Sequence, residues 1–299
     1  MPKPAVLVVG SLHYDIMVEA HHLPRRDETA VGSRWYPKFG GKGGNQAVAV
    51  ARAGVASRMV GAVGDDDFGR FLRGHLRSAG VDDHFIAALP GVGSGMSVAI
   101  MDATGDYAAT IVSGANLAID PAQLAADGPW RDVALLVLQN EVPEAVNIAA
   151  ARAARARGFR TVLNAAPARA LPEELALLVD ILVVNAVEAE MMGAGRVNSL
   201  ADAAEAARML AARFGTVVVT AGAEGLAALG PDGALVSLPA ERVRVVSRHG
   251  AGDAFIGALA ARLVAGDGLR PACTAAAHAA ALHVSGQGGA PAAGAQAAQ

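Results

Sequence analysis

The fold is constrained most by short Val- and Leu-rich runs that alternate with longer Ala-rich runs over most of the chain. The short runs are apolar throughout, which is typical of parallel strands that are buried on both faces. The longer runs have the apolar spacing of helices and end at glycines. This alternation predicts βαβ units, and therefore an α/β fold whose mostly parallel central sheet is covered by helices on both faces. The predicted strands include 134–138, 161–164, 181–185 and 216–220, and the predicted helices include 144–157 and 200–214.

Two regions depart from this alternation. Residues 13–39 and 95–112 have extended patterns with turns such as 102–106, and no helical run separates their strands. We therefore predict that they form a small separate sheet. The alternative is that these strands pack directly on the main domain.

Composition limits the partners and the location of the protein. The chain has 299 residues, of which 53% are hydrophobic, enough for one large α/β domain or two smaller ones. Arg, Gly or Asp interrupts the longest apolar runs, so we expect no membrane span. The net charge of −3 offers no electrostatic footprint for nucleic acid. The first residues lack the apolar segment of a signal peptide, and the lone Cys273 cannot form an internal disulfide, so we expect a cytoplasmic protein.

The run Gly-Ala-Gly-Asp-Ala-Phe at 250–255 leads into the apolar run 256–264. Glycine-rich backbone at a helix start holds anions through its free N–H groups and the helix dipole. A carboxylate beside them, Asp253, can accept a proton from an attacking hydroxyl. The run therefore predicts phosphoryl transfer to an alcohol. The same residues also fit an ordinary helix start with an Asp near its cap.

A second glycine-rich run, Phe-Gly-Gly-Lys-Gly-Gly-Asn-Gln at 39–46, precedes the apolar-periodic run 47–53. Its glycines allow a ligand close to the backbone. Asn45 fits either a helix cap or an amide that binds a sugar hydroxyl. Because Lys42 is followed by glycine rather than Ser or Thr, the run is not a Walker loop, and neither run fits the dinucleotide-binding fingerprint.

These two runs resemble the two signatures of the PfkB family of sugar kinases, and most closely those of its ribokinase branch. Further segments in the same order extend the resemblance from about residue 5 to about residue 291. They are 10–15, 164–169 and 185–190.

The resemblance implies a kinase domain over 1–292 with a ribokinase-like three-layer α/β/α fold. The segments 13–39 and 95–112 would form a β-sheet lid over the sugar site and a homodimer contact. The exposed apolar residues of that contact would be Ile16, Val18, Val98 and Ile100. From Gly286 onward we expect a loop and then a disordered tail, 293–299, since the segment is rich in Gly, Ala and Gln.

The resemblance also implies the catalytic and sugar-binding residues. Asp253 would deprotonate the sugar hydroxyl as it attacks the γ-phosphorus of ATP. The N–H groups of Gly250, Ala251 and Gly252 would stabilise the charge on the transferred group. Sugar hydroxyls would be bound by Asp15, Gly41, Lys42, Asn45 and Glu141 together with Asp253.

On the nucleotide side the resemblance implies a magnesium ion held through water by Asn185 and Glu188. ATP would be bound by Asn185, Thr220, Gly222, Gly225 and Gly252. Simpler interpretations remain open, because Asn185 and Glu188 have the spacing of a capping box and the glycines at 222 and 225 fit a hairpin turn.

Two positions depart from the family pattern. His13 stands where the ribokinase branch usually has Asn, which leaves the sugar open. Ser247 and Arg248 replace the usual Asp-Thr pair associated with a monovalent cation, so we expect weak or absent potassium activation, with Arg248 as a fixed charge near the anion hole.

The function expected from the sequence is ATP-dependent phosphorylation of a sugar, with ribose as the leading substrate. Nucleosides and other pentoses or ketohexoses are alternatives within the same family. A catalytically silent sugar or nucleotide sensor is an alternative of another class, although a pure sensor would have no need of Asp253.

Overall fold

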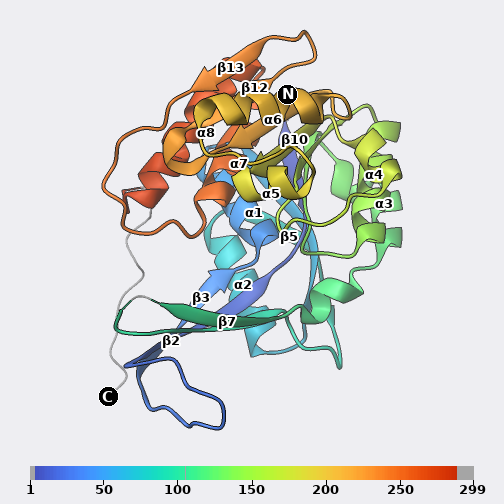
Figure 1. Cartoon of the computed structure of the whole chain (residues 1–299). Helices are drawn as coiled ribbons and strands as arrows, with labels where there is room; N and C mark the ends of the chain where they lie inside the picture. Colours follow the sequence, from blue (N-terminus) through green and yellow to red (C-terminus); the bar gives the residue numbers. More distant parts are fainter. Residues whose placement is uncertain (1–3, 105, 288–299) are drawn as a thin grey trace.

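A mostly parallel sheet runs through the centre of the protein, as the alternation of strands and helices predicts (Figure 1). The computed structural model describes residues 4–104 and 106–287. Within them this sheet has nine strands in the order β13-β12-β11-β10-β9-β8-β1-β4-β5. All neighbouring strands are parallel except at the β11–β12 and β12–β13 pairs. The strands are β1 (Ala5–Val9), β4 (Ala56–Gly64), β5 (Val81–Leu89), β8 (Val133–Gln139), β9 (Arg160–Asn164), β10 (Ile181–Asn185), β11 (Thr216–Thr220), β12 (Leu226–Leu229) and β13 (Leu235–Leu238).

Helices cover both faces of this sheet because alternate residues of each buried strand point to opposite sides. Val6 and Val8 of β1 belong to one apolar core, and Leu7 and Val9 belong to the other. One face carries α1 (Lys42–Arg52), α2 (Asp67–Ser78), α7 (Ala251–Val264) and α8 (Leu269–Val284). The other carries α3 (Glu144–Ala156), α4 (Glu173–Leu178), α5 (Ala186–Met191) and α6 (Leu200–Ala211). Short 3₁₀ turns complete the fold: η1 (Gly114–Ala118), η2 (Pro121–Ala125), η3 (Gly128–Trp130) and η4 (Gly222–Glu224).

The helices and strands predicted from the sequence agree with this architecture, with small differences at their ends. The helix predicted over 200–214 ends at Ala211, because the chain then turns and buries Phe214 in the core. The predicted tail, 293–299, lies outside the described residues. In the part of the chain that the structure describes, no helix has both the length and the apolar character needed to cross a lipid bilayer.

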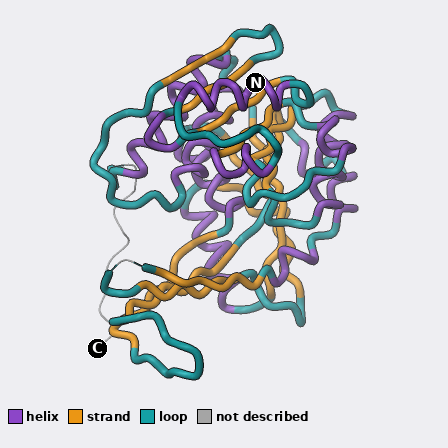
Figure 2. The backbone as a smooth tube through the Cα atoms, in the orientation of Figure 1, coloured by secondary structure: helices purple, strands orange, loops and turns teal. Residues whose placement is uncertain are grey.

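The small separate sheet is present as predicted, in the order β3-β2-β6-β7, and Figure 2 shows its strands projecting beyond the central sheet. Its strands are β2 (His13–Ala20), β3 (Gly32–Gly40), β6 (Met96–Met101) and β7 (Tyr107–Val112). The four apolar residues expected to be exposed are half-buried within the single chain, which corrects that expectation. The exposed apolar residues of this sheet instead include Trp35 and Tyr107, with 65% and 72% of their surface open.

Helix α2 packs against strands β2 and β3 of the small sheet. The ring of Tyr14 stacks on Phe68 with 4.0 Å between ring centroids and meets the edge of Phe71. The ring of Phe39 stacks on His75 at 4.2 Å. Since neighbouring strand residues point to opposite faces, His13 and Asp15 face away from these aromatic contacts.

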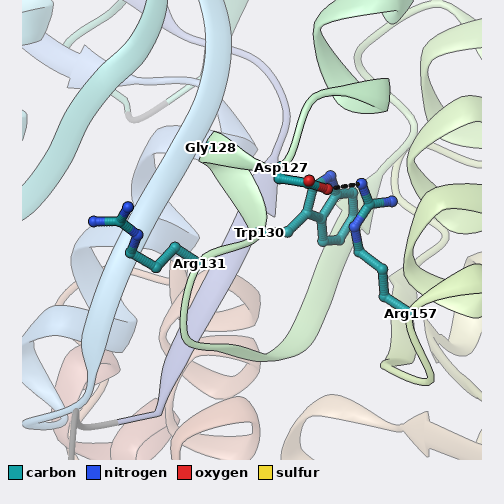
Figure 3. Close-up of a pocket in the computed structure, with 5 residues that line it drawn as sticks. All are labelled: Asp127, Gly128, Trp130, Arg131 and Arg157. Carbon is teal, nitrogen blue, oxygen red and sulfur yellow. Dashed lines mark hydrogen bonds and ion pairs between the residues drawn. The ribbon is translucent and has the colours of Figure 1, made fainter.

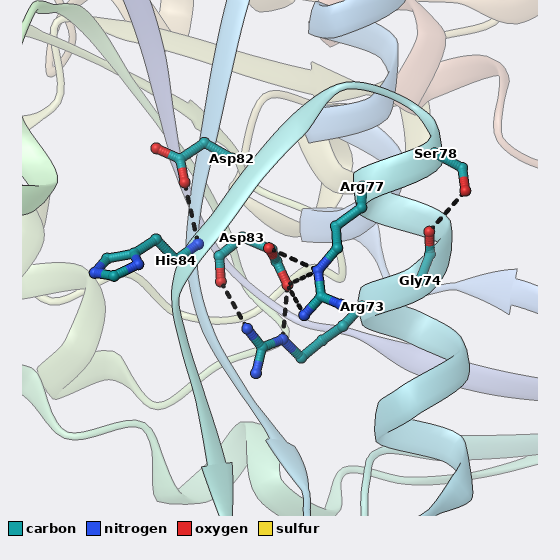
Figure 4. Close-up of polar contacts among 7 residues, drawn as sticks. All are labelled: Arg73, Gly74, Arg77, Ser78, Asp82, Asp83 and His84. Carbon is teal, nitrogen blue, oxygen red and sulfur yellow. Dashed lines mark hydrogen bonds and ion pairs between the residues drawn. The ribbon is translucent and has the colours of Figure 1, made fainter.

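Helix α2 is held to β5 in turn by two arginines that both form ion pairs with one carboxylate (Figure 4). The Nε atom of Arg73 lies 2.7 Å from Oδ2 of Asp83, and Nε of Arg77 lies 3.1 Å from Oδ1. Burial alone would raise the pKa of Asp83, but the hydrogen bonds from Arg77 and Arg73 outweigh it and lower that pKa. The helix on which the small sheet packs is therefore held to the central sheet through ionic contacts.

Helices α1 and α7 approach each other closely at Gly257. A Cβ atom at residue 257 would lie 2.3 Å from Cβ of Ala49 and 2.8 Å from the backbone N of Val50. We expect Gly257→Ala to lower the free energy of unfolding by about 1–3 kcal/mol, because the helices would have to separate. Chemical denaturation and thermal melting measure this change.

Gly74→Ala is the matched control, since Gly74 also lies inside a helix but has no atom within 4 Å of its Cβ position. This variant should be more stable than the parent by about 0.5–1 kcal/mol. Equal effects at the two positions would contradict the proposed contact at Gly257.

Candidate active site

Two helix N-termini and the segments that follow β1 and β8 meet at one edge of the central sheet. They bring together residues far apart in the sequence, since Asn45 of α1 contacts Asp253 of α7 and Ser11 contacts Glu141. The carboxyl ends of the parallel strands lie at this edge, where open α/β sheets bind ligands.

Asp253 lies in the first turn of α7 and is buried, with 7% of its surface exposed. Its Oδ1 accepts a hydrogen bond from Nε2 of Gln46 at 3.0 Å, and its Oδ2 accepts one from Nδ2 of Asn45 at 3.3 Å. Burial raises the pKa of Asp253 to about 6, with a smaller contribution from Glu141, while Lys42 and the two amides act in the opposite direction. A carboxylate with this pKa is suited to act as a general base near neutral pH.

The backbone beside Asp253 carries the N–H groups of residues 250–252, and one of these groups already has an acceptor. Gly250 caps α7 in the left-handed region at φ 85°, which glycine adopts most easily. The N–H of Gly252 is a first-turn group that cannot find an acceptor within its own helix. The N–H of Ala251 instead donates to the carbonyl of Arg248 at 3.3 Å, so this donor is partly engaged.

The glycines of the 39–46 run are needed for close packing of the backbone, in addition to their predicted role of letting a ligand approach it. Gly41, at φ 87°, precedes α1 as its N-cap, and a Cβ there would lie 2.7 Å from Cα of Leu12. At Gly43 a Cβ would lie 2.5 Å from N of Ser11. The glycines thus let α1 begin directly against the segment that follows β1. The helix starts at Lys42, so Asn45 lies inside it, which excludes the capping alternative for Asn45.

Glu141 joins the segments around this helix start. Its Oε2 accepts hydrogen bonds from the Ser11 hydroxyl at 2.5 Å and from the backbone N–H of Lys42 at 2.8 Å. Glu141 and Lys42 lie in one polar cluster with Asp253, whose pKa responds to the charges of both.

Asp15 lies on β2 with 9% of its surface exposed, and its Oδ1 accepts a hydrogen bond from the hydroxyl of Ser97 at 2.5 Å. A Cβ at residue 40 would come within 2.0 Å of Oδ2 of Asp15, so glycine at 40 leaves room for this carboxylate. His13 has 5% of its surface exposed, and its Nε2 has no hydrogen-bond partner among the described residues.

Asn185 and Glu188 form the capping box that their spacing allows. Oδ1 of Asn185 accepts from the N–H of Glu188 at 2.8 Å, and Oε2 of Glu188 accepts from the N–H of Asn185 at 2.9 Å. Burial raises the pKa of Glu188, while the Asn185 N–H and the charge of Lys42 oppose this. Among the described residues, no group of three or more His, Cys, Asp or Glu could hold a metal ion. Magnesium often binds through few protein ligands and several waters, so a single buried carboxylate at the helix cap fits that mode.

Thr220, Gly222 and Gly225 lie at the hairpin between β11 and β12. The hydroxyl of Thr220 donates to the carbonyl of Val184 at 3.4 Å. Gly225 has φ 114°, and a Cβ there would lie 2.1 Å from the carbonyl oxygen of Leu238. The turn itself therefore requires glycine at 225, and a nucleotide contact at these residues stays a prediction.

Sequence reasoning missed several polar residues that hold the site. Gln46 and Ser97 contact the two aspartates, and Ser11 contacts Glu141. Buried Asn116 braces the segment after β1, because its side chain exchanges hydrogen bonds of 2.9 and 2.8 Å with the backbone of Leu12. Gln46 could have been found from its place beside Asn45, whereas nothing local marks Asn116.

A surface pocket of about 320 Å³ lies outside this site (Figure 3). Arg157 pairs with Asp127 at 2.7 Å and covers the ring of Trp130. Asp127 and Trp130 precede β8 and Arg157 follows α3, whereas Glu141 follows β8, so the pocket is at the opposite edge of the sheet. No predicted site residue lines it.

Comparison with known proteins identifies the family of the chain. The profile of the pfkB family carbohydrate kinases matches residues 3–294. Ribokinase of Mus musculus is 34% identical over 260 residues, 86% of this chain and 80% of that protein. Deoxyribokinase of Salmonella typhi is 32% identical over 286 residues, 95% of this chain and 93% of that protein. The structure of Arabidopsis thaliana ribokinase complexed with ribose and ATP superposes with a TM-score of 0.87 at 28% identity, covering 95% of this chain and 93% of that one.

The fold and the family define a phosphotransferase that acts on an alcohol group of a sugar. The chain belongs to the pfkB family of carbohydrate kinases, as its two glycine-rich runs predicted, and its three-layer fold is ribokinase-like.

The pKa of Asp253 generates a prediction for the pH dependence of turnover. Because this pKa is about 6, protonation should remove the base below that pH, and kcat/KM should fall about tenfold per pH unit there. Above about pH 7 the rate should be constant. A pH profile of kcat/KM with saturating magnesium measures this limb.

Gln46→Leu separates Asp253 from other titrating groups, including the phosphates of the nucleotide. The hydrogen bond from Gln46 lowers the pKa of Asp253, so its loss should move the acidic limb to higher pH. A limb that stays in place in this variant would belong to another group.

Proposed function

We propose that the protein transfers the γ-phosphoryl group of ATP to the terminal hydroxyl of ribose, giving ribose 5-phosphate. The observation that carries this proposal is the buried Asp253, held by Asn45 and Gln46 beside the free backbone donors at the start of α7. The ribokinase relatives, and the Arabidopsis enzyme complexed with ribose and ATP, support these substrates.

In this proposal the sugar lies between the start of α1, the small sheet and α7. Asp15, Asn45 and Glu141 bind its hydroxyls together with Lys42 and the backbone of Gly41. A carboxylate suits adjacent hydroxyl groups because it accepts a hydrogen bond from each.

Asp253 then accepts the proton of the attacking hydroxyl as its oxygen bonds to phosphorus and the bond to the ADP oxygen breaks. The N–H groups at Gly250 and Gly252, and the partly engaged one at Ala251, stabilise the charge of the transferred group. Asn185, Thr220, Gly222 and Gly225 bind the nucleotide. Magnesium, when bound near Asn185 and Glu188, supplies charge neutralisation on the phosphates.

We further propose a cytoplasmic homodimer in which the small sheets of two chains meet, with residues 1–292 as one kinase domain. Support comes from β7, all of whose residues are exposed, and from exposed Trp35, Tyr107 and Ile111. Apolar surface gathered in this way favours a protein partner. As lids, these sheets would limit the access of water to the transferred group.

A substrate panel tests the proposed function. With magnesium and ATP, the protein should form ADP most rapidly with ribose, compared with deoxyribose, fructose, adenosine and inosine at equal concentration. Asp253→Asn should lower kcat by at least about 100-fold, since the proton acceptor is lost, while ribose affinity changes little. A coupled ADP assay and calorimetry measure the two quantities.

Undiminished turnover in Asp253→Asn would contradict the assigned base. Faster turnover on deoxyribose, on a ketohexose or on a nucleoside would favour the corresponding alternative. Buried His13 and the similarity to a deoxyribokinase are the observations that motivate these alternatives. Tyr14 gives less support to a nucleoside, because its ring packs on Phe68 and Phe71. Ligand-induced stabilisation without ADP formation from any acceptor would favour a sensor.

We also propose that potassium activates the enzyme weakly or not at all. The hydroxyl of Ser247 accepts the N–H of His249 at 3.3 Å, and the carbonyl of His249 contacts His283 at 2.9 Å, so these oxygens already have donors. Neither Ser247 nor Arg248 offers a carboxylate, and a monovalent cation does not fit this donor set. Replacing potassium by tetramethylammonium at equal ionic strength should change kcat less than about twofold.

The double variant Ser247→Asp, Arg248→Thr restores the family pattern and is the comparison for this assay. Potassium should change the rate of this double variant. A many-fold loss of turnover of the natural protein without potassium would contradict this proposal.

A further inference from the structure

The last turn of α8 contacts the segment that leads into the anion-binding start of α7. The carbonyl of Val284 accepts hydrogen bonds from the N–H groups of Val246 at 2.8 Å and Ser247 at 3.2 Å. Nε2 of His283 lies 2.9 Å from the carbonyl oxygen of His249. Three hydrogen bonds therefore join residues 246–249 to two consecutive residues of α8.

The end of α8 is itself well defined. The N–H of Gln287 donates to the carbonyl of Leu282, and that of Gly286 donates to the carbonyl of His283. Together with Gly286 at φ 75°, these bonds form a Schellman motif, which ends the helix and satisfies its last carbonyls. The carbonyl of Val284 is left for Val246 and Ser247. His283 is thus carried by a helix end that is fixed by hydrogen bonds.

The contact with His249 acts on the peptide unit that precedes Gly250. A carbonyl oxygen can only accept, so Nε2 of His283 is the donor and carries a proton. In a planar trans peptide the carbonyl and the N–H of the next residue point in opposite directions. Holding the oxygen of His249 therefore fixes the direction of the N–H of Gly250. Donation to the oxygen also polarises the peptide, which strengthens that N–H as a donor.

We propose that His283 is a positioning residue for phosphoryl transfer, which holds the His249–Gly250 peptide so that its N–H stays aimed at the transferred group. The imidazole lies against this peptide closely, since a Cβ at Gly250 would be 3.0 Å from Nε2 of His283. This inference rests on the proposed function and adds to it a residue that lies outside both glycine-rich runs.

The test compares two substitutions of similar length and helix propensity. His283→Gln keeps an N–H donor near the position of Nε2, whereas His283→Met fills the same space without one. We expect His283→Met to lower kcat at least about tenfold. This loss should be smaller than the loss of about 100-fold or more that follows removal of an oxyanion donor. KM for ATP and ribose should change less than about threefold, and His283→Gln should restore most of kcat.

His278→Ala is the matched control, because His278 lies on the same helix and its exposed side chain pairs with Glu241 at 3.0 Å. It should keep kcat within about twofold of the natural protein. If His283→Met does not fold, His283→Asn replaces it, since its amide is too short to reach the carbonyl of His249.

Binding measurements give a second readout that a merely structural role would not produce. In His283→Met the affinity for MgADP should be unchanged, and that for MgADP with aluminium fluoride and ribose should fall by the same factor as kcat. The inference is overturned if the Met and Gln variants both keep kcat, if both lose it equally, or if His278→Ala loses as much. An inactive natural protein would instead overturn the proposed function.

Discussion

The structure depends on a buried carboxylate that two helices share. Asp253 belongs to α7, yet its hydrogen-bond donors, Asn45 and Gln46, belong to α1. A buried carboxylate is costly unless it is hydrogen-bonded. Its partners can reach it only because α1 and α7 are in close contact, with glycine at 257 where the backbones meet. The hydrogen bonds to Asp253 therefore depend on the packing of α1 against α7.

One lysine acts on two of the acidic groups around this carboxylate. The charge of Lys42 lowers the pKa of Asp253 and that of Glu188, against the effect of burial in each case. Its backbone N–H also binds Glu141. Lys42 therefore compensates several acidic groups where a polyanionic nucleotide is proposed to bind, while two helix N-termini add positive potential.

The segment that leads into the start of α7 is hydrogen-bonded to the last turn of α8. In this chain His283 donates to the carbonyl of His249, and the carbonyl of Val284 accepts from the N–H groups of Val246 and Ser247. Rigid support of this kind matters because donors aimed in advance stabilise developing charge without reorganisation at the moment of transfer.

The sequence by itself determined the α/β class, the small separate sheet and the two glycine-rich runs, because periodicity and glycine placement are local properties of the chain. It also named Asp15, Lys42, Asn45, Glu141 and Asp253, of which four lie in one polar cluster. Only the tertiary structure decided which donors surround each acid. Gln46, Ser97 and His283 act through contacts between residues distant in sequence, and no local spacing encodes such contacts. The exposure of Ile16 was mispredicted for the same reason, since burial depends on neighbouring strands that the local pattern does not specify.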